Sequence, residues 1–567
     1  MSKGMRKGLT SYGDPGFSLF LRRAFIKAMG FSDDALERPI IGITDTFSDY
    51  NPCHGNVPQL IEAVKRGVML AGGLPMAFPT ISIHESFSNP TSMFLRNLMA
   101  MDTEEMIRAQ PMDAVVLISG CDKTVPAQLM AAASADVPAI LLITGPMLVG
   151  HHKGEELGAC TDCRRLWAMH RAGQMDEAEI DVVSGRLAPT NGTCMVMGTA
   201  STMACVSEAL GITLPGTGSI PATHADRLRA AEASGARAVA MAKSGGPKPS
   251  EILTKTAFDN ALTVLQAIGG STNGLVHLCA LAGRLGIEID FDAFDKLGRT
   301  VPTLIDLKPS GAHYMEHFHW AGGVPKLLKE LGDLIDGTAL TVTGEPLSAA
   351  IEQAEEVPNQ TIIRTRANPL QASGAMAVLY GNLAPRGAII KQSAASPALM
   401  QHEGRAVVFD SVEDMTNRMD DPDLDVIADD ILVLRNAGPV GAPGMPEAGY
   451  LPIPRKLAQQ GVKDMVRISD ARMSGTAFGT IVLHIAPEAA IGGPLGLVRN
   501  GDRIRLDVAN RSIALLVDDK EIEARKKTYQ PPAPHEGSDR GYLSLYLKTV
   551  NQADQGCDFD FMRKAGH

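Results

Sequence analysis

The sequence predicts an α/β protein with two domains: a parallel-sheet α/β domain over residues 1–365 and a smaller, β-rich, barrel-like domain over residues 366–567. Three observations predict this arrangement. Short β-branched runs alternate with helical patterns in the first part of the chain, which is typical of a parallel sheet covered by helices. Near residues 340–368, charged, Pro and Asn residues follow no sustained period, as in a linker. Beyond that segment, strand patterns dominate.

The N-terminal domain shows strand and helix patterns in alternation. Buried strands are expected at residues 39–44, 75–83, 113–119 and 137–144. Helices are expected at residues 57–73, 126–136, 199–210 and 221–243. The first of these helices ends at Gly72-Gly73, a helix-stop signal, and the second opens with Pro126 in its first turn.

The C-terminal domain is predicted to be rich in strands. These strands are expected at residues 405–411, 430–436, 464–472 and 479–487. The run 502–519 has the pattern of a hairpin that turns at residues 509–511. At roughly 150 residues per domain, a chain of 567 residues is expected to form three to four domains. Large α/β cores often exceed that size, so two domains are equally acceptable.

Composition narrows the class of protein. Lys+Arg 53 against Asp+Glu 64 gives a net charge of −11, which argues against a nucleic-acid or anionic-membrane protein. The apolar run Val137–Val149 is shorter than the ~20 residues that span a bilayer. The basic N-terminus is followed by no apolar run, so no secretory signal is expected, and eight cysteines are too few for a disulfide scaffold. We expect a cytoplasmic enzyme whose partner is a small molecule, with no nucleic acid and no membrane.

Three cysteines have the same local setting. Cys53 in NPCHGN, Cys121 in SGCDKT and Cys194 in NGTCMV each follow a strand or Gly-rich turn and lie near a predicted helix N-terminus. Helix N-termini favour thiolates and anionic clusters. The spacing of the three matches no compact zinc or ferredoxin motif, so the residues alone leave open both a joint metal site and three inert thiols.

A C-x-x-C pair is formed by Cys160 and Cys163. A redox pair or half a zinc site would use this spacing, but no second pair and no thioredoxin-like sequence accompanies it. We interpret the pair as structural. A non-catalytic iron–sulfur or zinc protein centred on it is the competing hypothesis from another functional class. Under that hypothesis, Cys160→Ser removes bound metal, whereas a metal site at the other three cysteines loses metal in Cys121→Ser.

Several polar residues follow strands or lie in Gly-rich loops. Asp122 and Lys123 come directly after Cys121, and Glu85 sits at the end of another strand. Glu447 lies in a loop with four Gly and three Pro residues between Gly438 and Gly449. Carboxylates so placed can ligate a hard cation. A salt bridge at a helix start, or a surface turn, is the alternative.

A serine and a threonine follow a strand in SDARMSGTAFG. Ser474 and Thr476 do not match the G-x-S-x-G nucleophile motif, and no Walker A loop or H-E-x-x-H motif is present in the sequence. A serine in such a position is ordinarily a turn residue.

Together these segments resemble the dihydroxy-acid and sugar-acid dehydratases, which are iron–sulfur hydro-lyases. The resemblance covers nearly the whole chain. It rests on the blocks NPCHGN, SGCDKTVPAQLMAAA, NGTCMVMGTASTMA, GGSTNGLVHL, NAGPVGAPGMPE and SDARMSGTAFGTIVLHIAPEAAIGGPLGLVRNGD. The tail at residues 535–562 resembles the corresponding segment of the sugar-acid branch. The CHGN block also resembles dihydroxy-acid dehydratases.

The resemblance implies a site and a reaction. Cys53, Cys121 and Cys194 would hold a [2Fe–2S] cluster, and four residues would hold Mg²⁺: Glu85, Asp122, Glu447 and Lys123, the last as an anionic carbamate. Ser474 would be the base and Thr476 would lie near the substrate carboxylate. A serine hydroxyl can act as a base only if an adjacent cation favours its ionised form.

The same resemblance implies the substrate class and assembly. A sugar acid (an aldonate such as arabinonate or xylonate) would lose water to give a 2-keto-3-deoxy acid. The alternatives are a dihydroxy-acid dehydratase of branched-chain amino-acid biosynthesis, or an enzyme that acts on both substrates. Members of this family are usually homodimers or homotetramers, and we expect one of these here.

Overall fold

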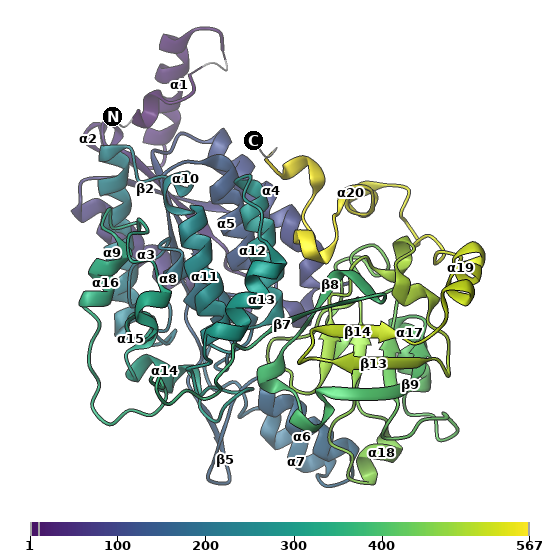
Figure 1. Cartoon of the computed structure of the whole chain (residues 1–567). Coiled ribbons are helices and arrows are strands. Elements are labelled where there is room, and N and C mark those ends of the chain that lie inside the picture. Colours follow the sequence, from purple (N-terminus) through teal and green to yellow (C-terminus); the bar gives the residue numbers. More distant parts are fainter. Residues whose placement is uncertain (1–2, 10–11, 565–567) are drawn as a thin grey trace.

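The computed structural model describes residues 3–9 and 12–564 and contains two β-systems (Figure 1). The N-terminal part holds a four-stranded parallel sheet in the order β2-β1-β3-β4. The C-terminal part holds a closed barrel in the order β10-β11-β12-β8-β7-β14-β13-β9. The predicted class, an α/β domain with a parallel sheet followed by a barrel-like β-rich domain, is confirmed.

The parallel sheet has four strands, most of which are buried runs rich in aliphatic residues. Its strands are β1 (Ile40–Asp45), β2 (Leu74–Pro79), β3 (Ala114–Ser119) and β4 (Ala139–Ile143). Every residue of β3 and β4 is buried, as expected for a sheet with helices on both faces. β2 is shorter than predicted, because after Pro79 the chain leaves the sheet and leads to Glu85.

Helices cover both faces of this sheet. Helix α3 (Val57–Leu70) packs along α9 (Ala225–Ser244) on one face, and α5 (Thr124–Ala135) contacts α4 (Ser92–Ala109) and α12 (Thr272–Arg284) on the other. The remaining helices of the first part are α1 (Pro15–Lys27), α2 (Asp33–Leu36), α6 (Thr161–Arg171), α7 (Glu177–Ser184), α8 (Thr199–Ala209), α10 (Pro249–Ile252), α11 (Lys255–Ala267), α13 (Phe291–Thr300), α14 (Met315–Trp320), α15 (Gly323–Leu331) and α16 (Leu347–Glu352). A small hairpin, β5 (Gly150–His152) with β6 (Glu155–Leu157), precedes α6.

The barrel has an aliphatic core of its own. Its strands are β7 (Ala377–Gly381), β8 (Ala384–Ile390), β9 (Gln401–Phe409), β10 (Ile431–Leu434), β11 (Arg467–Ser469), β12 (Ile481–Leu483), β13 (Arg503–Asp507) and β14 (Ser512–Leu515). The helices α17 (Val412–Arg418), α18 (Arg455–Gln459), α19 (Asp519–Thr528) and α20 (Gly541–Thr549) belong to this half of the chain. β13 and β14 form the predicted antiparallel hairpin, and Arg511 in its turn has a φ of 54°.

Two segments tie the halves of the chain together. Residues 361–374 run back along the first half, where Arg364 N donates to Leu304 O at 2.8 Å. The tail after α20 packs against α4 and α12, and Arg284 Nε makes a buried ion pair with Asp558 at 2.6 Å. Among residues 3–9 and 12–564, no helix is both long enough and apolar enough to cross a bilayer.

Candidate active site and metal centre

The predicted site residues lie where the parallel strands end. Cys53 follows β1 in the 3₁₀ turn Pro52–His54, and Glu85 follows β2 in the 3₁₀ turn Glu85–Phe87. Cys121, Asp122 and Lys123 connect β3 to α5. Because the carboxyl ends of parallel strands share one edge of the sheet, residues distant in sequence meet there.

Five thiols and one imidazole gather at this edge, and we call them the thiol pocket: Cys53, Cys121, Cys194, Cys160, Cys163 and His84. The possible ligand atoms of Cys53, His84 and Cys121 all lie within 4.8 Å of one another. Cys160 Sγ lies 3.4 Å from Cys194 Sγ, and Cys160 also contacts Cys163. Gly192 N donates to Pro52 O at 3.0 Å, which holds the loop of Cys194 against the turn of Cys53. The structure therefore brings the segments of the three predicted cluster cysteines together with the C-x-x-C pair.

His54 holds two of the cysteine blocks in place. Its Nδ1 lies 2.8 Å from the carbonyl oxygen of Thr46 and must be the protonated nitrogen, because a carbonyl can only accept. Its Nε2 then accepts the backbone N–H groups of Gly120 at 3.2 Å and Cys121 at 3.3 Å. Burial lowers the pKa of His54 to about 4, so the ring is neutral near pH 7.

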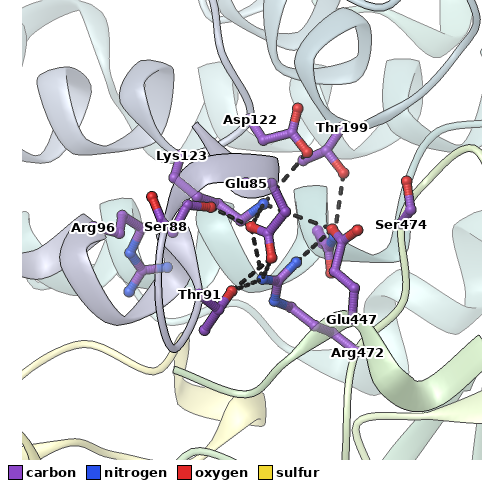
Figure 2. Close-up of polar contacts among 12 residues, drawn as sticks. Glu85, Ser88, Thr91, Arg96, Asp122, Lys123, Thr199, Glu447, Arg472 and Ser474 are labelled. Carbon is purple, nitrogen blue, oxygen red and sulfur yellow. Dashed lines mark hydrogen bonds and ion pairs between the residues drawn. The ribbon is translucent and has the colours of Figure 1, made fainter. Parts of the chain in front are cut away.

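The predicted Mg²⁺ ligands also converge, and we call them the carboxylate cluster: Glu85, Asp122 and Glu447 around Lys123 (Figure 2). Lys123 is fully buried, and its Nζ lies 3.4 Å from Asp122, 3.6 Å from Glu85 and 3.9 Å from Glu447. Glu447 comes from the Gly- and Pro-rich loop after β10, in the C-terminal half of the chain. The cluster therefore joins the two halves.

Arg472 is a member of this arrangement that sequence reasoning missed. The guanidinium is 1% exposed and bridges two carboxylates, with Nη2 at 2.9 Å from Glu85 and Nη1 at 2.5 Å from Glu447. Burial alone would raise the pKa of Glu85, but Arg472 and Lys123 hold it below its usual range. The only signal in the sequence was an arginine two residues before Ser474.

The loop that carries Arg472 also carries Ser474 and Thr476. Ser474 Oγ lies 2.8 Å from Thr476 Oγ1, and both residues are buried. Two contacts fix the loop from the N-terminal half. Asn273 Nδ2 donates to Met473 O at 3.0 Å, and Thr161 Oγ1 donates to Thr476 O at 3.0 Å. The barrel thus inserts its serine loop into the first half of the chain.

Close packing explains the glycine between Ser474 and Thr476. A Cβ on Gly475 would lie 2.5 Å from Ser271 Cβ and 2.9 Å from the backbone nitrogen of Thr199. Ser271 caps α12 and Thr199 is the first residue of α8, so the serine loop lies against the N-termini of two helices. Those ends carry partial positive charge, which favours an anion on the loop. Cys194 is close to the same helix, because Ser201 Oγ donates to Cys194 O at 3.1 Å.

The residues present fit the two metal groups that the resemblance implies. Thiols are the ligands that iron–sulfur clusters use, and the thiol pocket supplies them, with Cys53 and Cys121 buried and the others partly exposed. Three carboxylates are hard ligands suited to Mg²⁺. With an ammonium on Lys123, the two cations Lys123 and Arg472 offset two of the three acids, and the ammonium would repel a divalent ion bound among them. A carbamate on Lys123 would remove that repulsion and add a fourth oxygen ligand.

Comparison with known proteins assigns the family. The model described as "Dihydroxy-acid/6-phosphogluconate dehydratase N-terminal" matches residues 38–350, and the model of the C-terminal part matches residues 361–557. The chain belongs to this dehydratase family. It is accordingly a hydro-lyase.

Named relatives match over almost their full length. The chain is 48% identical to an L-arabonate dehydratase of Azospirillum brasilense, covering 96% of this chain and 94% of the relative. It is 46% identical to an L-arabinonate dehydratase of Rhizobium leguminosarum bv. trifolii, with 97% and 95% covered. It is 39% identical to a dihydroxy-acid dehydratase of Acetivibrio thermocellus, with 94% and 96% covered.

Proposed function

We propose that the protein is a sugar-acid dehydratase that converts an aldonate, such as arabinonate or xylonate, to a 2-keto-3-deoxy acid. The observation that carries the proposal is the meeting of three parts at one edge of the sheet: the thiol pocket, the carboxylate cluster and the Ser474 loop. A dehydration of this kind needs all three. It must stabilise negative charge next to a carboxylate, activate a hydroxyl as a leaving group, and remove a weakly acidic proton.

We assign Cys53, Cys121 and Cys194 to a [2Fe–2S] cluster, and Glu85, Asp122, Glu447 and carbamylated Lys123 to Mg²⁺. When bound, these groups supply Lewis-acid chemistry at the leaving hydroxyl and neutralise charge that develops beside the substrate carboxylate. The protein's own residues orient the substrate. Thr476 would donate a hydrogen bond to the substrate carboxylate from the loop that carries the base.

Ser474 is the proposed base, taking the proton from C2 of the substrate on Oγ. A serine hydroxyl is a poor base near pH 7 unless its anion is stabilised. Its surroundings here favour the anion: the N-termini of α8 and α12 lie against the loop, and the Thr476 hydroxyl lies 2.8 Å from Ser474 Oγ. The nearby Mg²⁺ would add further stabilisation.

A sugar acid is favoured over a branched-chain dihydroxy acid by two facts. Identity is 46–48% to the arabinonate and arabonate dehydratases and 39% to the dihydroxy-acid dehydratase. The tail at residues 535–562, which resembles the sugar-acid branch, packs through α20 and Phe559 against α4 of the first half. It therefore belongs to the folded body that surrounds the site.

The experiment is a 2-keto-acid assay on anaerobically purified protein with Mg²⁺. Five- and six-carbon aldonates are compared with 2,3-dihydroxyisovalerate. We expect turnover of at least one aldonate to be faster than turnover of the branched-chain acid. Preference for 2,3-dihydroxyisovalerate would overturn the sugar-acid assignment, and equal rates would establish a promiscuous enzyme. Absence of turnover with every substrate, in protein whose iron and sulfide contents are full, would overturn the proposed reaction.

A further inference from the structure

We propose that Cys160 is a fourth thiolate ligand of the iron–sulfur cluster in the enzyme without substrate. The inference rests on the cluster proposed above for Cys53, Cys121 and Cys194. Three cysteines leave one iron position without a protein ligand. Cys160 supplies the free thiol that lies against this set, because its Sγ is 3.4 Å from Cys194 Sγ.

The segment that carries Cys160 is firmly held. Cys160 directly precedes α6, and Asp162 in the first turn of that helix is 1% exposed. The Asp162 carboxylate accepts from the Gly158 backbone N–H at 2.9 Å and from Tyr314 Oη at 2.9 Å, and it pairs with Lys308 Nζ at 3.1 Å. These contacts on both sides of Cys160 fix its backbone beside Cys194.

The same segment contacts the serine loop, which carries Ser474 and Thr476. Thr161, the residue after Cys160, donates its hydroxyl to the carbonyl of Thr476 at 3.0 Å. The position of Cys160 is therefore set together with the loop of the proposed base. A thiolate here would occupy the free iron position until substrate arrives and takes its place.

The chemistry of the donor suits iron. Thiolates are the usual ligands of [2Fe–2S] clusters, and four cysteines are the commonest set. Only the thiolate ligates, so binding of Cys160 to the cluster releases its proton. The first turn of α6 lies directly after Cys160, and a helix of 11 residues favours negative charge at that end.

His84 is the competing donor in the pocket. One of its ring nitrogens lies within 4.8 Å of the sulfur atoms of Cys53 and Cys121. Its Nδ1 accepts the backbone N–H of Ser86 at 3.2 Å and so caps the turn that carries Glu85. We assign His84 to the support of that turn and the free iron position to Cys160, and the experiment separates the two.

Cys163 provides a matched control for chemical access. It lies one turn further along α6, and both thiols line a cavity of about 500 Å³ between α6 and α7, with Trp167 and Leu187 in its wall. Both are partly exposed, whereas Cys53 and Cys121 are buried. A small alkylating reagent that enters the cavity therefore meets both Cys160 and Cys163.

The first measurement is alkylation by iodoacetamide under anaerobic conditions, with and without the cluster, followed by mass spectrometry of the peptides. In the cluster-free protein we expect both cysteines to react. In the cluster-loaded protein we expect Cys160 to react at least about tenfold more slowly while Cys163 still reacts, because a thiolate bound to iron is not a free nucleophile. Equal reaction of Cys160 in the two forms would overturn the proposal.

The second measurement is the visible and electron paramagnetic resonance spectrum of the loaded protein without substrate. We expect Cys160→Ser to shift both spectra, and Cys163→Ser and His84→Asn to leave them as in the wild type. A shift in His84→Asn with none in Cys160→Ser would give the position to His84. Wild-type protein that contains zinc, or no iron and sulfide, would overturn the proposed cluster itself. Failure of the proposed function is therefore distinguished from failure of the Cys160 assignment.

Discussion

The thiol pocket and the carboxylate cluster are neighbours in the chain but are held in different ways. Cys121 and Asp122 are consecutive, as are His84 and Glu85. The thiol pocket is built within the N-terminal half, and neutral groups such as His54 support it. The carboxylate cluster takes Glu447 and Arg472 from the C-terminal half, and ion pairs hold it.

This contrast shows which part of the site depends on assembly of the whole chain. The N-terminal half alone contains the sulfur ligands, so iron binding should tolerate changes in the barrel loops. The carboxylate cluster has buried charges that are balanced only when both halves are in place. Changes in the barrel should therefore affect Mg²⁺ binding and the position of the base more strongly than iron binding.

The largest effect is expected for Ser474→Ala, which removes the proposed base and touches neither group of ligands. We expect turnover to fall by about 10²–10⁴-fold or more, the usual range for loss of a general base. The visible absorption of the cluster should stay unchanged. Steady-state 2-keto-acid formation and the spectrum, measured on one preparation, check both statements; activity close to that of the wild type would exclude Ser474 as the base.

Arg472→Met is expected to break the carboxylate cluster and to spare the thiol pocket. Glu85 and Glu447 would lose a partner that is 1% exposed, and breaking a buried pair costs about 3–5 kcal/mol. Urea unfolding of the metal-free protein measures this cost. Arg38→Met is the control, because the Asp34 partner of Arg38 is 78% exposed and such pairs contribute about 0–1 kcal/mol. If the variant also loses its iron, the two regions are not independent.

His54→Gln is the opposite test, aimed at the thiol pocket. The Gly120 and Cys121 N–H groups would lose their acceptor, at a cost of about 1–3 kcal/mol for buried donors left unpaired. We expect a lower iron content with Mg²⁺ binding retained. Iron and sulfide analysis beside calorimetry with Mg²⁺ measures both, and His402→Gln in the barrel is the control. Full iron content would mean that His54 does not position the cysteines.

Sequence patterns predicted the sheet and the local motifs well, for a physical reason. β1, β3 and β4 are continuous buried aliphatic runs, so their positions follow from composition. β2 was predicted four residues too long, because residues 80–83 keep an apolar pattern although they lie outside the sheet. β7 and β8 were missed, since Gly381, Gly387 and Pro385 interrupt their strand pattern.

The candidate site was predictable where motifs are local and not where distant segments meet. Arg472 and Glu85 are 387 residues apart, and no period in the sequence connects them. Cys160 and Cys194 are 34 residues apart, and their contact depends on how α6 docks beside the serine loop. The C-x-x-C pair was interpreted as structural, because its relation to Cys194 exists only in the folded chain.

The last effect concerns only the pH dependence of stability and comes from two buried acids that support the Glu447 loop at a distance. Glu488 accepts the N–H groups of Val440 and Gly441, and Asp470 accepts that of Ala437. Burial raises the pKa of Glu488 to about 7 and that of Asp470 to about 6. Since these values lie above those of the unfolded chain, the folded state binds more protons between pH 4 and pH 7. The stability that these groups contribute is present below about pH 4 and is lost as the pH rises through about 7.

Glu488→Gln should remove part of this pH dependence while keeping an acceptor for the loop. We expect the free energy of unfolding of the wild type to fall relative to the variant by up to about 3 kcal/mol between pH 4 and pH 8. Urea unfolding of metal-free protein across that range measures it, with Glu413→Gln on the exposed first turn of α17 as the control. A difference that does not change with pH would show that folding leaves the pKa of Glu488 unshifted, so that the group is ionised at pH 7. In that case the buried acids would belong with the carboxylate cluster, as charges that need a cation.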